Sequence, residues 1–240
     1  MNQKEFAKIQ SQVCNDIYIL YSTLQKIAEI HAEGLYQCMD VIKSSPFKYG
    51  EEQLVMSVDD ITINVEPTNI RHLSLTGKID HILMHLYFEG VIDANAWKDK
   101  EKNPWLNISY KSILEVMTID GEKFYKDFHI DYLQQSNTGF EDIHPQSHVH
   151  FSSRNDNVEA LNIDVPRLAH YPVDIVLGLS ISLQNYAPDL FAKLILDNQY
   201  VSLCLQSQKR ILIPYYVMCN GIDGEGKSNK NMKIVCPYLL

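Results

Sequence analysis

The clearest pattern at the start of the chain is a stripe of apolar residues spaced three or four positions apart. The stripe comprises Phe6, Ile9, Val13, Ile17, Leu20, Leu24 and Ile27. This spacing predicts a long amphipathic helix that reaches at least His31, and a second helix is expected over residues 35–42. We expect the stripe to pack on the rest of the protein, and dimerisation through a helical hairpin is the alternative.

Strand signals follow these helices. Residues 54–65 mix β-branched and apolar side chains before the turn residues Pro67-Thr68-Asn69, so a strand or hairpin is expected there. Two further strand-like runs, residues 108–119 and 123–133, flank Asp120-Gly121, which favours a tight type I′ hairpin turn. Alternation divides the second run into an apolar and a polar, titratable face: Phe124, Phe128, Ile130 and Tyr132 against Tyr125, His129 and Asp131.

Three other segments complete the expected fold. Ile79, Ile82, Leu83 and Leu86 have helical spacing, which predicts a helix with His81 and His85 on its solvated face. Residues 173–185 are expected to form a helix opened by Pro172, and Pro188 begins another. Residues 200–219 are β-branched and aromatic enough for two strands.

The absence of repeats and low-complexity linkers predicts a single α+β domain over residues 1–240, an antiparallel sheet packed with helices. Residues 1–48 are expected to form its helical N-terminal segment, and residues 50–240 are expected to form the mixed sheet and helices.

Composition narrows the class of protein. The formal net charge is −9, and the excess acid lies in residues 1–150, so the chain is not expected to coat nucleic acid or anionic membrane with its whole surface. Its five cysteines include no C-x-x-C, which argues against a disulfide framework and a thiolate zinc site. With no signal-like N-terminus and no apolar run of about 18 residues, we expect a cytoplasmic protein without a membrane partner.

Residues 221–228 match the nucleotide-binding pattern G-x-x-x-x-G-K-[ST]. Only twelve residues follow Ser228, too few for the helix that would direct backbone amides at a phosphate and for a later metal-binding strand. Asp223 and Glu225 would also repel phosphate. We therefore expect no nucleotide binding here, and a polar hairpin loop between two C-terminal strands.

Histidines concentrate in the second half of the chain. Five of the nine lie between positions 129 and 170: His129, His144, His148, His150 and His170. A strand over residues 147–152 would direct His148 and His150 to one face and Val149 and Phe151 to the core. Pairing with residues 123–133 would add His129 and Asp131 to the polar face.

A second group of polar residues follows downstream. Arg167 offers a planar fork for phosphate or carboxylate, and His170 precedes a predicted helix N-terminus. The hypothesis is that His148, His150, Arg167 and His170 form one anion-processing site, with His129, Asp131, His144 and Asp174 as secondary candidates. The alternatives are that His170 caps or packs, Arg167 pairs with an acid, and Asp174 complements the helix dipole.

These residues carry a partial resemblance. H-P-x-x-H-x-H, followed by P-R-x-x-H-x-P-x-D-I-V-L, resembles a family of uncharacterised bacterial proteins classed as a domain of unknown function. The resemblance covers residues 124–185 and implies no activity. Histidines on a small sheet are also distantly similar to toxin-type ribonucleases of toxin–antitoxin systems, although those chains are shorter and lack the helical N-terminus.

Two function classes remain open from the sequence. The first is a histidine-dependent phosphodiesterase or ribonuclease of a toxin or phage-defence system, acting on RNA or another phosphodiester. It would work without a metal, by proton transfer between imidazoles, or with a divalent metal at the His148/His150 face. The second is a non-catalytic module that docks a protein partner, or a second copy of itself, through the N-terminal helix.

Overall fold

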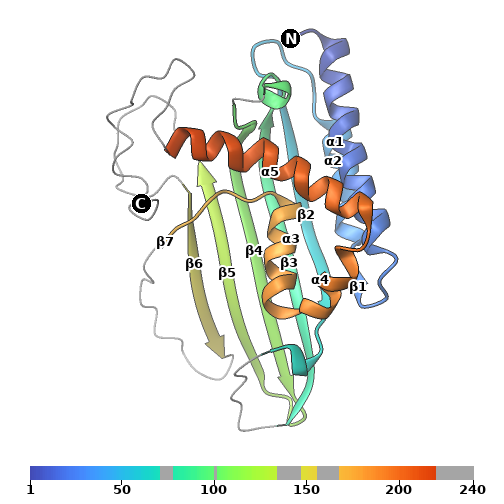
Figure 1. Ribbon diagram of the computed structural model, residues 1–240, viewed down its shortest axis with the longest axis vertical. Coiled ribbons are helices and arrows are strands. Elements are labelled where there is room, and N and C mark those ends of the chain that lie inside the picture. Colours follow the sequence, from blue (N-terminus) through green and yellow to red (C-terminus); the bar gives the residue numbers. More distant parts are fainter. Residues whose placement is uncertain (71–77, 100–101, 134–146, 156–167, 220–240) are drawn as a thin grey trace.

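The fold is known from a computed structural model, which describes residues 1–70, 78–99, 102–133, 147–155 and 168–219. In these residues, seven strands form one sheet whose spatial order, β1 to β7, follows the chain, and each neighbouring pair is antiparallel. Helices pack on one face of this sheet (Figure 1). The predicted α+β class, with helices on an antiparallel sheet, is therefore confirmed.

The strands are β1 (Ile30–His31), β2 (Gln53–Asn64), β3 (Ile79–Asp93), β4 (Trp105–Thr118), β5 (Lys123–Leu133), β6 (Ser147–Asn155) and β7 (Leu168–Ala169). The helices are α1 (Gln3–Leu24), α2 (Glu33–Ser44), α3 (Ile175–Tyr186), α4 (Pro188–Leu194) and α5 (Asn198–Cys219). Two 3-10 turns, η1 (Pro67–Asn69) and η2 (Ala96–Lys98), lie between strands. None of the described helices is long and apolar enough to cross a bilayer.

Helix α1 buries the apolar stripe that its sequence predicts. A capping box between Asn2 and Glu5 begins the helix, and the stripe packs in the chain's own core. This confirms the packing interpretation, and it leaves that stripe unavailable for dimerisation. The expected extension to His31 is wrong, because the helix ends at Leu24 and Ile30 and His31 pair with β2 instead.

The predicted helix around residues 79–86 is wrong, because this segment belongs to β3. Its buried residues alternate: Ile82, Met84, Leu86, Phe88, Gly90 and Ile92. The period is two, so the apparent helical spacing was incidental to a long half-buried strand. Consequently His81 and His85 project from the face of the sheet opposite the helices.

The hairpin between β4 and β5 forms where the sequence predicts it. The Gly121 N–H donates to the Thr118 carbonyl at 2.9 Å, which puts Ile119 and Asp120 at the central positions of the turn. Gly121 follows with φ of +83°, a left-handed conformation that favours glycine. Asp120-Gly121 is therefore not the central pair of a two-residue type I′ turn; a longer turn of the glycine-bulge kind takes its place.

The C-terminal part of the described chain is helical, so the prediction of two strands over residues 200–219 is wrong. Its buried residues Tyr200, Leu203, Ser207 and Ile211 recur every three or four positions in α5. Packing on α1 and α3 thus outweighs the β-propensity of the segment. The glycine-rich residues 221–228 lie outside the described residues, but the strand expected before them is part of α5.

Helices α3 and α4 lie close to their predicted positions. Helix α4 begins at Pro188, as expected, whereas α3 begins at Ile175 with Asp174 as its N-cap rather than at Pro172. Gly178 lets α3 approach β4 closely, because a Cβ there would lie only 2.4 Å from the Tyr110 ring. The Tyr110 and Ser182 hydroxyls share a buried hydrogen bond of 2.7 Å.

The described helices cover only one face of the sheet, and we call the opposite face the outer face. It carries alternate residues of each strand, and strand pairing aligns them across the sheet. The described histidines other than His170 all belong to it: His31, His81, His85, His129, His148 and His150. The fold therefore collects titratable side chains on the face that no described helix covers.

Candidate functional site

The pairing of β5 with β6 brings four predicted site residues together. His129 lies directly opposite His150, and Asp131 lies opposite His148. Directly paired residues project to the same side of a sheet, so all four side chains share the outer face. The expectation that His148, His150, His129 and Asp131 form one polar patch is therefore confirmed. Val149 is buried, as predicted, whereas Phe151 is 42% exposed.

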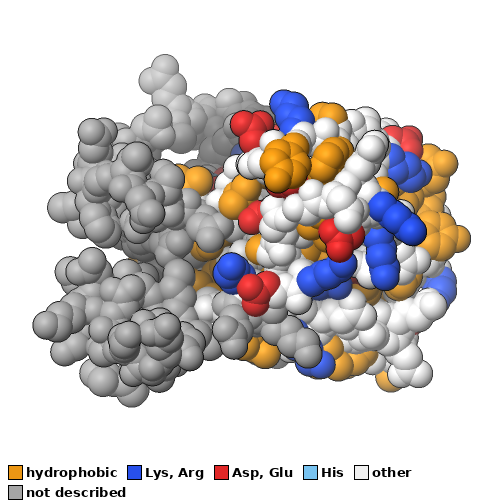
Figure 2. All heavy atoms as spheres, turned by 90° about the horizontal axis from the view of Figure 1, so that it is seen from above, with side chains coloured by type: hydrophobic (Ala, Val, Ile, Leu, Met, Phe, Trp, Pro, Cys, Tyr) orange, Lys and Arg blue, Asp and Glu red, His pale blue; other side chains and the backbone are white. Residues whose placement is uncertain are grey.

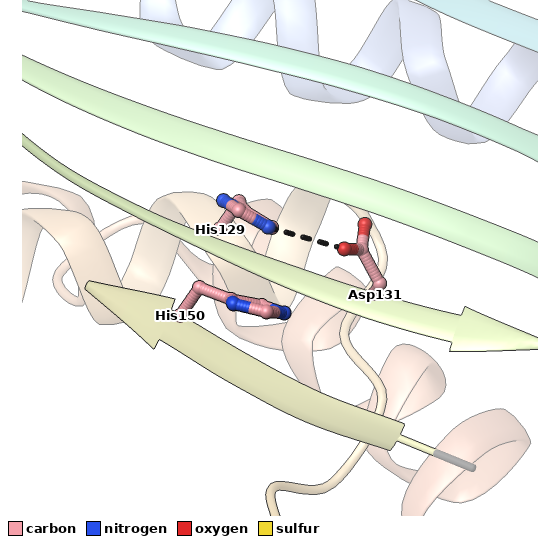
Figure 3. Close-up of side chains that lie close together, drawn as sticks. All are labelled: His129, Asp131 and His150. Atoms are coloured by element: carbon pink, nitrogen blue, oxygen red, sulfur yellow. Dashed lines mark ion pairs between the residues drawn. The ribbon is translucent and has the colours of Figure 1, made fainter. Parts of the chain in front are cut away.

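The imidazole rings of this patch are in contact. The His129 and His150 rings stack with centroids 4.3 Å apart and planes 17° from parallel. Figure 3 shows these two rings side by side, with Asp131 next to His129. The His148 ring meets His150 edge-on, with centroids 4.7 Å apart. The outer face thus presents three neighbouring imidazoles from two strands.

Asp131 is the carboxylate at the centre of the patch. Its Oδ2 lies 3.3 Å from His129 Nε2 and 3.9 Å from His148 Nε2, and Ser109 Oγ donates to its Oδ1 at 2.8 Å. Burial favours the protonated acid and raises the pKa of Asp131, but hydrogen bonds from His129 and Ser109 outweigh burial and hold that pKa below its usual value. Asp131 is therefore ionised at neutral pH.

Three of these residues are close enough to share one metal ion. The nearest ligand atoms of His129, Asp131 and His150 all lie within 4.8 Å of one another. A metal with bonds of about 2.0–2.2 Å holds its ligand atoms closer together than this, so the side chains would have to rotate toward the ion to bind it. Two imidazoles and one carboxylate suit zinc, iron(II) or manganese(II). His148 stands beside them as a fourth base.

Strand β4 contributes two residues that were not among the candidates predicted from the sequence. Ser109 lies opposite Asp131 and orients its carboxylate, and Lys111 lies opposite His129 with an exposed side chain. Alternation in residues 108–119 assigns both to the polar face of the predicted hairpin, so the signal was present in the sequence. An ammonium beside the imidazoles offers a charge for an anionic substrate.

His170 is placed away from the imidazole cluster. Its backbone N–H donates to Ser147 O at 3.2 Å, directly after the Ala169–His148 pair, so alternation puts it on the core side of the sheet. Its ring lies on Tyr171, and Nδ1 is 2.6 Å from the Tyr171 carbonyl. Burial lowers the pKa of His170 and keeps its ring neutral. This arrangement supports the packing alternative.

Asp174 has a structural position. Its buried carboxylate caps α3 by accepting the N–H groups of Val176 and Leu177 at 3.1 and 3.0 Å. Burial raises the pKa of Asp174, and the hydrogen bonds to the carboxylate do not fully offset this effect. The remaining candidates, His144 and Arg167, lie outside the described residues.

No protein-family model, curated protein or solved structure matched the chain. The resemblance drawn from residues 124–185 therefore stays a prediction.

Proposed function

We propose that the outer face binds one divalent transition-metal ion and uses it to hydrolyse phosphodiesters, with RNA as the substrate class. The observation that carries the proposal is the placement of the His129, Asp131 and His150 ligand atoms within 4.8 Å of one another. Strand pairing holds two of these residues opposite each other, so the set belongs to the frame of the sheet and not to a loop.

Each residue then has a definite task. His129, Asp131 and His150 would hold the ion, which would supply an activated water when bound. Ser109 fixes the orientation of Asp131. His148 would deliver a proton to the leaving oxygen of the phosphodiester as the bond between that oxygen and phosphorus breaks. Lys111 offsets the charge of the phosphate.

A metal-free version of the same reaction is the second candidate. The Asp131 carboxylate lies 3.3 Å from His129 Nε2 and orients that ring, and His129 would act as the base in acid–base catalysis. His148 or His150 would then act as the acid. This version uses the same residues but is insensitive to chelators, so a metal analysis distinguishes the two.

The structure restricts the surfaces that a binding module could use to dock a partner. The apolar stripe of α1 is buried in the chain's own core and does not face a partner. A module of this class would dock its partner through the exposed surface of the N-terminal helices, where Tyr18 and Tyr36 are each 56% exposed, or through the outer face, and would show no hydrolysis. A role in a toxin or phage-defence system stays a proposal that depends on nuclease activity.

The first experiment measures metal binding. Protein treated with a chelator and then titrated with zinc or manganese(II) should bind one ion per chain. His129→Ala and His150→Ala should each weaken the affinity by about 100-fold or more, beyond the 10–100-fold typical of residues that only support a ligand. His81→Ala is the matched control, because His81 shares the outer face and pairs with Asp80 outside the cluster.

The second experiment measures hydrolysis of RNA, of DNA and of a chromogenic phosphodiester, together with growth inhibition in a bacterial host. Metal-loaded protein should cleave, and His148→Ala should lower the rate by about 10²–10⁴-fold without loss of metal. Cleavage that survives chelation but fails in the histidine variants would favour the metal-free version. Metal binding without cleavage would leave the binding module, and neither activity would contradict both proposals.

A further inference from the structure

A cleft of about 510 Å³ lies between α1, η2 and α5, away from the outer face. Its volume is in the range of sites for small organic ligands. Residues far apart in the sequence form it: Lys8 from α1, Lys98 from η2 and Arg210 from α5. Figure 2 views the molecule from above and shows Lys and Arg side chains near one another on its described part, with carboxylates between them.

Arg210 is held in a fixed orientation at this cleft. Its guanidinium carbon lies 4.0 Å from the centroid of the Trp97 ring. Asp16 Oδ2 accepts from Nη1 at 2.7 Å, and Gln206 Oε1 accepts from Nη2 at 3.3 Å. A guanidinium has five N–H groups, so donors remain for a ligand, and a fixed planar fork matches the oxygens of a phosphate.

Two lysines make the cleft electropositive. Lys8 and Lys98 are both exposed, and in the part of the chain that the structure describes neither forms an ion pair. Asp16 is the carboxylate among the lining residues, and Arg210 already engages it. Lys8 and Lys98 therefore add two positive charges to the cleft that no described carboxylate pairs at ion-pair distance, in a chain whose net charge is −9.

Uncharged polar groups complete the lining. Gln12 and Asn15 on α1 present amides that donate or accept hydrogen bonds. Arg210 covers one face of the Trp97 ring, and the rest of the indole packs on the core, so the ring does not offer a free stacking platform. The lining thus selects for several negative charges at one group rather than for a large aromatic ligand.

We propose that this cleft binds a small phosphate-bearing molecule, with Lys8, Lys98 and the Trp97-stacked Arg210 contacting its phosphate oxygens. The cleft lies among α1, η2 and α5, whereas the proposed metal ligands lie on β5 and β6, on the outer face of the sheet. The inference is therefore independent of phosphodiester hydrolysis, and either can fail without the other.

Calorimetric titration of the full chain with pyrophosphate tests the proposal, with citrate as a polyanion that lacks phosphate. Lys8→Gln/Lys98→Gln should weaken pyrophosphate binding by about tenfold or more, and Arg210→Lys should weaken it although the charge is kept. Lys209→Gln is the matched control, because Lys209 is exposed on α5 but does not line the cleft.

Expected results are measurable pyrophosphate binding, weaker citrate binding and an unchanged Lys209→Gln variant. The lysine variants change exposed side chains, so they should fold normally even if Arg210→Lys does not. If no pyrophosphate binding is detected up to about 10 mM, the dissociation constant is weaker than the millimolar range, and the proposal is overturned. Equal affinity for citrate, or an equal loss in Lys209→Gln, would overturn it too.

Discussion

The two faces of the sheet differ in the burial and polarity of their side chains. On the helix-covered face, alternate residues of β3 and β4 are apolar and buried, and Phe88 and Tyr110 have no exposed surface. The outer face carries imidazoles, lysines and carboxylates at partly exposed positions of the same strands. One face supplies the free energy of folding, which leaves the other free to carry chemistry.

The largest expected effect is a difference in the free energy of unfolding between alanine substitutions at two neighbouring residues of β3, one on each face. Phe88→Ala should lower the free energy of unfolding by about 3–5 kcal/mol, because the ring is fully buried and packs edge-on against Trp105. Tyr87 faces outward and is only partly buried, so Tyr87→Ala should cost about 1 kcal/mol. Chemical denaturation measures both, and equal costs would contradict the division into a core face and an outer face.

A smaller loss of stability is expected from a substitution that tests how closely α3 packs on the sheet. Gly178→Ala should destabilise by about 1–3 kcal/mol, because the new Cβ would overlap the Tyr110 ring, which has no room to move. Gln184→Ala, at an exposed position of the same helix, is the control and should change stability by less than about 0.5 kcal/mol. A neutral Gly178→Ala in thermal and denaturant unfolding would show a looser contact between α3 and β4.

The smallest expected effects are changes in folding stability with pH, of about 1 kcal/mol or less. They have opposite signs for two histidines. The hydrogen bond to Asp60 raises the pKa of His85, which lies on the outer face. Its stabilising contribution is complete below its unfolded pKa of about 6.5 and is lost as the pH rises through the higher folded value. Burial lowers the pKa of His170, so its contribution is complete above about pH 6.5 and is lost as the pH falls through the lower folded value.

Unfolding of His85→Gln and His170→Gln between pH 5 and 8, a range of about three units around the histidine pKa, measures these two slopes. The stability gap between parent and variant should shrink with rising pH for His85→Gln and with falling pH for His170→Gln. Slopes of the same sign would contradict the opposite pKa shifts expected for the two rings.

Local pattern was sufficient to predict much of the candidate site. Period-two alternation in residues 123–133 and 147–152 assigned His129, Asp131, His148 and His150 to one face, and the intervening distance along the chain was compatible with pairing. The same logic extends to Ser109 and Lys111 through the β4–β5 hairpin. The stripe of α1 likewise follows directly from its spacing.

Long-range packing decided the rest. Ile79, Ile82, Leu83 and Leu86 fit a helix and a strand equally well over a short window, and pairing with β2 and β4 on both sides selected the strand. Residues 200–219 have strand-like composition, yet burial against α1 and α3 made them a helix. Propensity differences between the two states are small compared with the free energy of such burial.

The sequence by itself determined the polar face, the amphipathic helix and the class of chemistry that three imidazoles and a carboxylate permit. Only the tertiary structure placed His170 on the other side of the sheet, made Asp174 a helix cap and lowered the pKa of Asp131. It also formed the cleft, which Lys8 and Arg210 line together although they lie about two hundred positions apart in the sequence. Spacing along a chain fixes which face a side chain occupies, whereas burial, hydrogen bonding and charge depend on neighbours that the fold brings from elsewhere.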